Sequence, residues 1–572
     1  MPDLLTINQL HVDFHSARGQ TKAVNGISLQ LVAGETLGIV GESGSGKSVT
    51  ALAIMRLLAH SPGTKIGGEI RYQSPRQPEP VDLLTLPEGK MQAFRGAEIA
   101  MIFQEPMTSL NPVFRCGHQV TEAIQLHQKV DFATAQAQTL ALFDRVKLPD
   151  PDRIFRAYPH EISGGQKQRV MIAMAMSCQP ALLIADEPTT ALDVTVQQTI
   201  LELMRDLRDE RGLSMLFISH DLGVIAEICD RVVVMHHGAI VESGTVEQVL
   251  QQPRHPYTKG LVACRPSLRH RLHRLPTIAD FMAEKSFVSQ VVTPAETKAR
   301  QTALSGQEPV LQVRHLTVRY PARKNWLGQP TEWLQAVQDV SFDVYPGETF
   351  GLAGESGCGK TTLGRAIARL TPADQGVVRY KGVNLLELDG DGLRPYRRQI
   401  QVVFQDPYSS LNPRMTIGDA IVEPMQVHRM HGNERARREK AVDLLQTVGL
   451  PADHFQRYPH EFSGGQRQRI CIARALALEP KFLICDEMVS ALDVSVQATV
   501  LNLLLDLREQ FGLTYLFISH DLSVIKQMCD RLLIMNRGQI EALGTPEQIY
   551  NHPERDYVRK LIAAIPGQSA AR

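Results

Sequence analysis

The feature that most constrains this chain is a long internal repeat. The block YPHEISGGQKQRV begins at Tyr158, and YPHEFSGGQRQRI begins 300 residues later at Tyr458. The stretch GESGSGKS starts at Gly41 and returns as GESGCGKT at Gly354, an offset of 313. The first copy therefore carries about a dozen additional residues before its middle block, and we expect them in the proline-rich stretch 74–80. A unit of roughly 250 residues used twice is a duplicated domain, because solenoid repeats have far shorter periods.

The length of the chain, 572 residues, also requires more than one hydrophobic core. We predict a first domain over 1–264, a linker over 265–308 and a second domain over 309–572. The linker assignment rests on the polar composition of 265–308, which shows little apolar periodicity. Four arginines near its start are interpreted as solvated, with a headgroup or nucleic-acid contact as the alternative: Arg265, Arg269, Arg271 and Arg274.

Composition and charge exclude several classes of protein. Lys+Arg and Asp+Glu both total 61, and this neutral balance argues against a dedicated nucleic-acid binder. The eight cysteines form no CxxC pair, which disfavours a zinc or iron–sulfur site and indicates a reduced, intracellular chain. We find no signal peptide, and the most apolar stretch, 170–185, is broken by Gln179 and Pro180. Any membrane function would therefore need other chains.

Each repeat contains the phosphate-binding pattern GxxxxGK[ST], between an apolar run and a run compatible with a helix. Glycines let backbone N–H groups surround phosphate oxygens, and the start of the helix adds its positive dipole end. The lysines would reach the terminal phosphates, and the hydroxyls would hold Mg²⁺. The predicted residues are Gly41, Gly44, Gly46, Lys47 and Ser48 in the first repeat, and Gly354, Gly357, Gly359, Lys360 and Thr361 in the second. This pattern alone does not separate a kinase, a GTPase and a transport ATPase.

Two carboxylates follow a continuous apolar run in each repeat, in ALLIADEP and KFLICDEM. Such a run predicts a buried parallel strand, whose carboxyl end is where open α/β sheets bind ligands. We predict that Asp186 and Asp486 coordinate Mg²⁺, and that Glu187 and Glu487 orient the attacking water. The alternative is that these acids only cap the next helix.

A histidine stands 33 residues beyond each of these glutamates, in the repeated strand sequence LFISHDL. We predict that His220 and His520 contact the γ-phosphate. A lone histidine of this kind would more often be structural, but its repetition at the same position favours the functional interpretation.

The segments ISGGQKQR and FSGGQRQR resemble the signature sequence of ABC ATPases. Together with the glycine-rich loops, Gln104, Gln405 and DExxxALD, the resemblance covers nearly the whole chain outside the linker. It implies an α/β fold with two tandem ABC-type P-loop nucleotide-binding domains. Each domain would have a RecA-like parallel sheet core, an antiparallel β subdomain and a helical signature subdomain.

The resemblance also implies two composite sites for ATP and Mg²⁺, formed by intramolecular pairing of the domains. The first site would combine the first P-loop, Gln104, Asp186, Glu187 and His220 with Ser463, Gly464 and Gly465. The second would combine the second P-loop, Gln405, Asp486, Glu487 and His520 with Ser163, Gly164 and Gly165. Gln104 and Gln405 would also ligate Mg²⁺. Phe14 and Tyr320 would stack on adenine, with core packing as the alternative.

Both sites retain their glutamate and histidine, so we expect both to hydrolyse ATP. Two departures from the family pattern are mild. Met488 replaces the more usual Pro or Ala after Glu487, and Cys358 replaces a Ser or Gly in the second P-loop. Because that loop acts mainly through its backbone, the cysteine is expected to cost little.

The segments MIFQEPMTSLNPVF and HPYTKGL are similar to the peptide and nickel importer family, although the second repeat diverges with ERDYVRKLI. The resemblance implies the ATP-hydrolysing subunit of a bacterial importer of a small peptide, either glutathione or a di- or oligopeptide. It also implies two membrane permease subunits and a periplasmic or lipoprotein solute-binding protein. The chain would then be peripheral, at the cytoplasmic face of the inner membrane.

The competing interpretation is a tandem ABC ATPase that acts on the ribosome without a membrane partner. Such proteins resemble this one in motif order but typically carry a long charged helical arm between their domains. An ABC exporter half is disfavoured because no transmembrane segment is fused. We expect no nucleic-acid partner.

Overall fold

The computed structural model describes residues 3–16, 19–58, 63–75, 77–104, 109–190, 193–283, 290–325, 329–490 and 492–565. The chain divides into two compact units. Within the described residues, the first unit takes the chain up to Val262 together with 278–283, and the second takes Ala263–Thr277 and the chain from 290 to Ile565. Each unit is described by itself.

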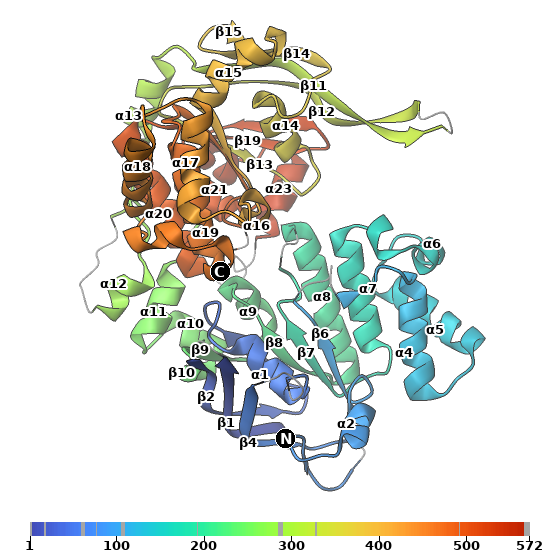
Figure 1. Cartoon of the computed structure of the whole chain (residues 1–572). Coiled ribbons are helices and arrows are strands. Elements are labelled where there is room, and N and C mark those ends of the chain that lie inside the picture. Colours follow the sequence, from blue (N-terminus) through green and yellow to red (C-terminus); the bar gives the residue numbers. More distant parts are fainter. Residues whose placement is uncertain are drawn as a thin grey trace. The chain divides into compact units, whose positions relative to one another are not determined.

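The first unit contains two sheets (Figure 1). A four-stranded antiparallel sheet has the order β2-β1-β4-β5. A six-stranded sheet has the order β10-β9-β3-β8-β7-β6, in which only β10 pairs antiparallel with its neighbour. The strands are β1 (Asp3–Ser16), β2 (Gly19–Val32), β3 (Thr36–Val40), β4 (Thr64–Tyr72), β5 (Val81–Asp82), β6 (Ile99–Ile102), β7 (Leu182–Asp186), β8 (Ser214–Ile218), β9 (Arg231–His236) and β10 (Ala239–Thr245).

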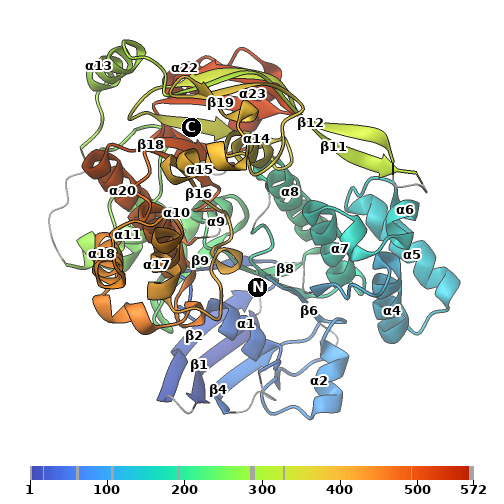
Figure 2. The same cartoon turned by 45° about the horizontal axis from the view of Figure 1, so that its top comes forward.

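Helices of the first unit surround the larger sheet. In both views α4, α5 and α6 lie at the opposite end of this domain from β1 and β2 (Figures 1 and 2). The helices are α1 (Lys47–Ile54), α2 (Glu88–Phe94), α4 (Cys116–Gln128), α5 (Phe132–Arg145), α6 (Pro151–Arg156), α7 (Gly164–Met176), α8 (Val194–Arg211), α9 (Leu222–Ile228), α10 (Val246–Gln251), α11 (Pro256–Ala263) and α12 (Ile278–Met282).

The second unit repeats both sheets. Its antiparallel sheet has the order β12-β11-β14-β15, and its larger sheet has the order β16-β17-β18-β13-β19-β20, which is the first arrangement read in reverse. The strands are β11 (Leu311–Lys324), β12 (Pro330–Val344), β13 (Thr349–Ala353), β14 (Gln375–Tyr380), β15 (Val383–Asn384), β16 (Ile400–Val403), β17 (Phe482–Asp486), β18 (Thr514–Ile518), β19 (Arg531–Asn536) and β20 (Gln539–Gly544). The helices are α13 (Pro294–Ser305), α14 (Lys360–Ile367), α15 (Gly390–Gln399), α16 (Pro407–Ser410), α17 (Ile417–Val427), α18 (Glu434–Thr447), α19 (Gly464–Leu476), α20 (Val494–Phe511), α21 (Leu522–Met528), α22 (Pro546–Asn551) and α23 (Asp556–Ala563).

The larger sheet is buried on both faces, which explains its continuous apolar strands. Every residue of β3, β7 and β8 is buried. Ile184 packs in the core shared with the antiparallel sheet, whereas its neighbours Leu183 and Ala185 pack in the core shared with the helices. The predicted fold class is confirmed: each unit has a mainly parallel core sheet, an antiparallel sheet and a helical subdomain.

The additional residues of the first repeat lie in three places, whereas the sequence analysis assigned them all to 74–80. The offset between the repeats is 313 at the P-loops. It is 308 between Gly68 of β4 and its counterpart Gly376 of β14, and 302 between Val81 of β5 and Val383 of β15. Only about half of the surplus therefore separates β4 from β5. Most of the rest precedes β4, because the path from α1 into that strand is also longer than its counterpart after α14, and the last two residues follow β5, since the middle block has an offset of 300.

Much of the stretch 265–308 is folded. It contains α12 and α13, and Ile278 of α12 lies against Gly260 of α11. The interpretation of the arginine cluster as solvated is wrong for Arg271, whose side chain is only 12% exposed. Polar composition misled here because backbone carbonyls of the second unit satisfy the guanidinium. The domain boundaries themselves stay a prediction. Among the described residues, no helix combines the length and the apolar character needed to cross a bilayer.

Packing in the helical subdomain of the first unit leaves no room for a larger side chain at one glycine of α4. A Cβ on Gly117 of α4 would lie 2.2 Å from the ring of Phe155, so we expect Gly117→Ala to lower the free energy of unfolding by about 1–3 kcal/mol. The shift of the urea unfolding midpoint measures this loss. The control is Gly89→Ala in α2, where a Cβ would meet open space, and which should be neutral or stabilising. Equal effects of the two changes would contradict the packing argument.

Candidate functional site

Each glycine-rich loop joins a buried strand to a helix. In the first domain the loop follows β3 and ends where α1 begins at Lys47. Gly41 has a φ of 153°, and a Cβ there would lie 2.2 Å from the carbonyl oxygen of Met235. Gly46 has a φ of 100°, and its Cβ would lie 2.4 Å from the carbonyl oxygen of Ala23. A side chain at either position would displace the loop, so the two glycines are sterically required.

The second loop has the same geometry. Gly354 and Gly359 face the carbonyl oxygens of Met535 and Ala336 in the same way. Between the outer glycines, Gly44 and Gly357 have open space where a Cβ would stand. The backbone of both loops can therefore approach a phosphate closely, which fits the predicted nucleotide.

The loop lysines are buried and directed back into their own loops. The Nζ of Lys47 donates to the carbonyl oxygens of Gly41 at 2.7 Å and Glu42 at 2.9 Å. Lys360 donates to Gly354 and Glu355, both at 2.8 Å. Each ammonium group is thus hydrogen-bonded to its own loop and lies inside the loop that would surround a phosphate.

A hydroxyl and a carboxylate meet beside each loop. Ser48 Oγ donates to Asp186 Oδ1 at 3.0 Å, and Thr361 Oγ1 donates to Asp486 Oδ1 at 2.9 Å. Burial raises the pKa of Asp186 to about 6, although the Ser48 hydroxyl opposes that shift, and burial also raises the pKa of Asp486. Among the described residues no three His, Cys, Asp or Glu side chains form a metal cluster. The oxygen pairs nevertheless fit Mg²⁺, which commonly takes one or two protein ligands together with phosphate oxygens and water.

The predicted water-orienting glutamates are held in an unusual conformation. Glu187 and Glu487 have φ values of 51° and 46°, in the left-handed region that side-chain-bearing residues rarely adopt. Their N–H groups donate to the carbonyl oxygens of Ile218 and Ile518, in the neighbouring strands of the sheet. Strain of this kind persists only where the surrounding structure enforces it, and it gathers at functional sites.

Several polar groups converge on Glu187. Gln104 Nε2 donates to its Oε2 at 3.2 Å, Thr190 Oγ1 donates to the same oxygen at 2.8 Å, and His220 Nδ1 lies 3.2 Å away. Burial alone would raise the pKa of Glu187, but His220, Thr190 and the Lys47 charge lower it to about 2. The carboxylate is therefore ionised at neutral pH and able to orient water.

The second glutamate has a related but different set of partners. Gln405 Nε2 donates to Glu487 at 3.0 Å, His520 Nδ1 lies 3.4 Å away, and Lys360 Nζ lies 3.5 Å away. Burial lowers the pKa of His520, but Glu487 outweighs burial and the net shift is upward. Ser490, the counterpart of Thr190, donates to the backbone oxygen of Glu487 instead. The structure thus brings each predicted glutamine and histidine to its glutamate, and it adds Thr190, which the sequence analysis missed.

The predicted signature residues lie at the start of two helices. Ser163 accepts a hydrogen bond from the N–H of Gln166 and caps α7, and Ser463 caps α19 in the same way. Ser163 and Gly164 are exposed, while a Cβ on Gly165 would lie 2.8 Å from Val196 of α8. Gly464 and Gly465 repeat these positions in the second domain. The start of α7 is exposed at Ser163 and Gly164, whereas at the start of α19 only Ser463 is exposed and Gly464 is half-buried. The first N–H groups of a helix and its positive dipole end can bind an anion.

The two predicted adenine-stacking aromatics differ. Phe14 of β1 is half-buried and packs against the core of its antiparallel sheet. Tyr320 of β11 pairs with Leu334 and is 38% exposed. Tyr320 is thus partly exposed to solvent, whereas Phe14 packs against the core.

A tyrosine far along the chain supports each P-loop, and the sequence analysis missed both residues. The N–H of Glu42 donates to the hydroxyl of Tyr257 at 3.0 Å, and the N–H of Glu355 donates to the hydroxyl of Tyr557 at 3.4 Å. Tyr257 is fully buried in α11, within the HPYTKGL segment. A signal was present, because the two tyrosines are 300 residues apart, like the other repeated motifs.

Comparisons with known proteins agree with this geometry. The family model described as ABC transporter matches residues 24–190 and 337–490. A second model, described as the oligopeptide/dipeptide transporter C-terminal region, matches residues 241–286, which include Tyr257.

Curated relatives align with the full length of the chain. The glutathione import ATP-binding protein GsiA of Salmonella choleraesuis (strain SC-B67) is 48% identical over 573 residues, covering 100% of this chain and 90% of the relative. The protein of the same name from Escherichia coli (strain K12) is 48% identical over 576 residues, with the same coverage. A solved dimeric ATP-binding cassette in a post-hydrolysis state, bound to ADP and phosphate, is 28% identical with a TM-score of 0.38, covering 41% of this chain and 98% of its own.

The contact between Tyr257 and the first P-loop generates a binding prediction. Tyr257→Phe removes the hydroxyl to which the N–H of Glu42 donates, so we expect the Kd for ATP to rise roughly fivefold, equivalent to about 1 kcal/mol. Titration with a fluorescent ATP analogue measures the change. Tyr515→Phe is the control, because its hydroxyl donates to the carbonyl oxygen of Leu504 inside the second domain. That variant should lose thermal stability without a change in Kd, and an unchanged Kd in Tyr257→Phe would rule out the supporting role.

Proposed function

The chain belongs to the ABC transporter family, and from that premise we propose that it is the ATP-hydrolysing subunit of an importer of a small peptide, with glutathione as the first candidate. The similarity to proteins named for glutathione import, which runs along the whole chain at 48% identity, carries this proposal. The match of residues 241–286 to a peptide transporter region favours an importer over the ribosome-bound alternative.

The chemistry of hydrolysis at each site is mainly positioning. The loop backbone and Lys47 or Lys360 would bind the phosphates. Ser48 with Asp186, and Thr361 with Asp486, would hold Mg²⁺, which when bound supplies positive charge beside the phosphates. Glu187 and Glu487, ionised and held by the glutamines and histidines, would orient the attacking water.

Two composite sites form part of the proposal. Ser163, Gly164 and Gly165 would complete the site of the second P-loop, and Ser463, Gly464 and Gly465 the site of the first. The capped starts of α7 and α19 support this pairing, since the first N–H groups of a helix have no acceptor within the helix. Fusion in one chain would keep each signature at a high effective concentration near its partner loop.

The importer would also contain two membrane permease subunits and a periplasmic or lipoprotein solute-binding protein, with this chain peripheral at the cytoplasmic face of the bacterial inner membrane. Exposed apolar side chains after each glutamine support a permease contact. Val113 and Phe114 are 70% and 55% exposed. In the second domain Tyr408 is 65% exposed, near a cavity of about 470 Å³ that Gln405 and Asp406 help to line. Residues 105–108 of this segment lie outside the described part of the chain. A partner on these surfaces would lie next to the residues that contact the glutamates.

Hydrolysis at two sites is tested by Glu187→Gln and Glu487→Gln. Each change removes the negative charge that orients water, so each should lower ATP turnover by roughly 100-fold or more at saturating ATP. Steady-state phosphate release measures the effect, with the exposed Glu434→Gln of α18 as the control. The double variant should also remain in a compact ATP-bound form by small-angle scattering. Full activity in either single variant would contradict two working sites.

Transport is tested in bacteria that lack this gene. Uptake of labelled glutathione should fall without the gene, return with the wild-type copy, and stay low with the Glu187→Gln/Glu487→Gln copy. Uptake of a labelled dipeptide is measured in parallel. Rescue of the dipeptide alone would replace glutathione by a peptide substrate, and rescue of neither would refute the import proposal.

A further inference from the structure

An extended segment, residues 268–275, lies on the second domain; we call it the strap. Lys526 of α21 donates to the carbonyl oxygen of Leu268. The Arg271 guanidinium donates to the carbonyl oxygens of Gln527 at 3.1 Å, Met528 at 3.3 Å and Cys529 at 3.1 Å. The last carbonyls of a helix have no partner within it. Arg271 therefore caps the carboxyl end of α21 and adds a positive charge where the helix dipole is negative.

Two buried side-chain amides pair with the backbone of the strap. Gln527 accepts from the N–H of Leu272 at 3.0 Å and donates to its carbonyl oxygen at 2.6 Å. Asn502 of α20 does the same with Leu275, at 2.9 Å and 2.8 Å. Gln527 and Asn502 are 1% and 2% exposed, and Leu275 is 1% exposed. On this edge of the strap each amide thus takes the place of a neighbouring strand, whereas on the other edge Leu272 forms an antiparallel bridge with Val291.

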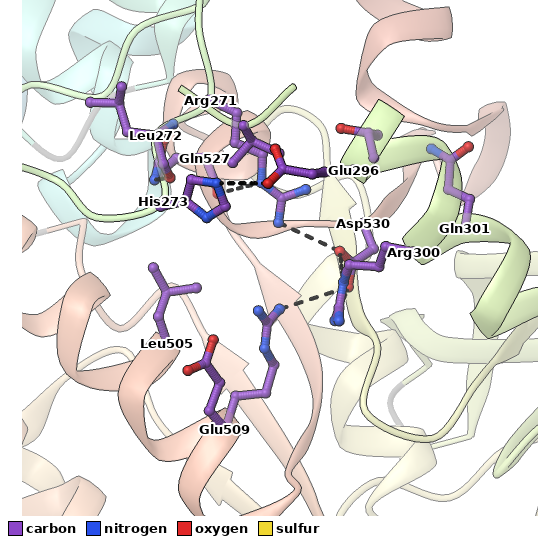
Figure 3. Close-up of a pocket in the computed structure, with 13 residues that line it drawn as sticks. Arg271, Leu272, His273, Glu296, Arg300, Gln301, Leu505, Glu509, Gln527 and Asp530 are labelled. Carbon is purple, nitrogen blue, oxygen red and sulfur yellow. Dashed lines mark hydrogen bonds and ion pairs between the residues drawn. The ribbon is translucent and has the colours of Figure 1, made fainter. Parts of the chain in front are cut away.

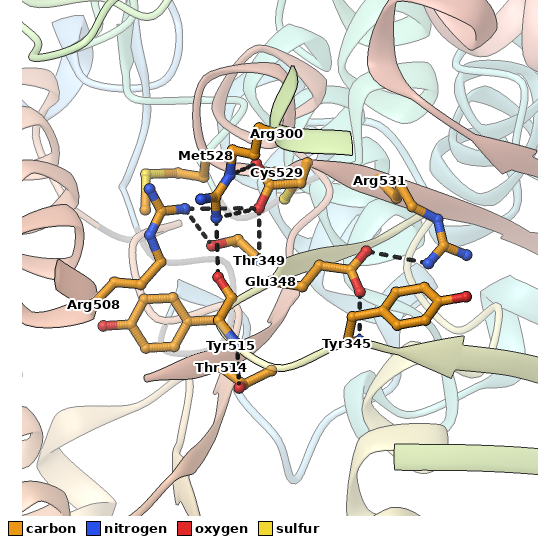
Figure 4. Close-up of polar contacts among 12 residues, drawn as sticks. Arg300, Tyr345, Glu348, Thr349, Arg508, Thr514, Tyr515, Met528, Cys529 and Arg531 are labelled. Atoms are coloured by element: carbon orange, nitrogen blue, oxygen red, sulfur yellow. Dashed lines mark hydrogen bonds and ion pairs between the residues drawn. The ribbon is translucent and has the colours of Figure 1, made fainter. Parts of the chain in front are cut away.

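A buried carboxylate ties the strap to the rest of the second domain (Figure 3). Figure 4 shows Arg300, Arg508 and Thr349 grouped together in that domain. Asp530 has a side chain only 2% exposed and receives Arg300 of α13 at 2.6 and 2.8 Å. Arg271 lies 3.5 Å away and Arg508 lies 3.8 Å away. Burial would raise the pKa of Asp530, but Arg300 and then Arg271 lower it. A cavity of about 210 Å³ lies between the strap, α13 and α20 (Figure 3).

The first domain lacks the chemistry that binds the strap. At the positions 300 residues earlier it has Glu202 and Glu227 in place of the two amides, and Ala226 in place of Lys526. A carboxylate only accepts hydrogen bonds, so it cannot pair with both the N–H and the C=O of an extended segment. The counterpart of Asp530 is Asp230, whose side chain is 55% exposed. The two halves are therefore equivalent at their P-loops but different here.

Helix α21, to which the strap binds, begins next to the second site. Asp521 caps the start of α21, and the preceding residue is His520, which lies beside Glu487. The helix has seven residues, so its two ends are only about 10 Å apart. We propose that the strap is a positioning device for the second site alone: when docked, it holds α21 and so keeps His520 against Glu487. This inference rests on the proposed ATPase function and makes the two sites unequal.

Hydrogen exchange of the full chain, followed by mass spectrometry, tests the docking itself. Gln527→Glu installs the residue of the first domain, and we expect the amides of Leu272 and Leu275 to exchange roughly fivefold faster. Arg271→Ala, made on the strap side, should have the same effect without altering the domain surface. Arg274→Ala is the control, because that side chain is 59% exposed. Unchanged exchange in both test variants would overturn the docking, whatever the chain hydrolyses.

Kinetics test the link to His520. In Gln527→Glu and Arg271→Ala we expect kcat for ATP to fall about fivefold with KM unchanged, because the binding groups of the loop are untouched. If the strap acts through His520, Arg271→Ala should have no further effect in a His520→Ala background but its full effect in a His220→Ala background. Equal effects in both backgrounds, or faster exchange with unchanged kcat, would overturn the positioning role. Failure of the ATPase proposal is distinguishable, because the wild-type chain itself would then not hydrolyse ATP.

Discussion

The hydrogen bond between a P-loop hydroxyl and a strand-end carboxylate is the contact on which each half depends. Ser48 and Asp186 are 138 residues apart, yet they lie 3.0 Å from one another because β3 and β7 are both neighbours of β8 in a parallel sheet. Parallel strands place their carboxyl ends at one edge, where loops can converge on a ligand. The buried apolar strands make that edge rigid, and the glycines of the loop let its backbone fit beneath neighbouring carbonyl groups. The polar groups around Glu187 are ordered only because this frame is in place.

Duplication preserved this frame and changed what surrounds it. In both halves the P-loop lysine donates to carbonyl oxygens of its own loop, a hydroxyl pairs with a carboxylate, and a tyrosine hydroxyl accepts a hydrogen bond from the loop. They differ at Thr190 and Ser490, which direct their hydroxyls to different oxygens of the adjacent glutamate. They differ more at the side chains that bind the strap, because α20 and α21 of the second half have buried amides where the first half has glutamates. A fused pair of ATPase domains can therefore be similar in chemistry and unequal in control.

The stretch between the repeats shows how a polar sequence can be part of a folded domain. A buried Asp530 is stable because Arg300, Arg271 and the N–H of Thr349 meet its charge. Removal of one arginine would leave a buried charge with less compensation, which costs far more than the loss of an exposed ion pair. The ordering of this segment thus follows from a few buried, complementary groups and not from an apolar periodicity.

The sequence alone determined the features that repeat or that follow from local pattern. The 300-residue offset, the glycine-rich loops, the strands ending in Asp186 and Asp486 and the fold class were all predictable, because short motifs encode backbone shape and buried strands have a continuous apolar pattern. Tertiary structure alone decided which distant groups meet. The hydroxyl of Tyr257 reaches the N–H of Glu42 across 215 residues, and the side chain of Arg271 is only 12% exposed although it stands in a stretch rich in arginine and histidine. Such contacts depend on how helices pack at the edges of the sheets. A hydrogen bond between two single residues gives no repeating pattern in the sequence, so the sequence alone does not predict it.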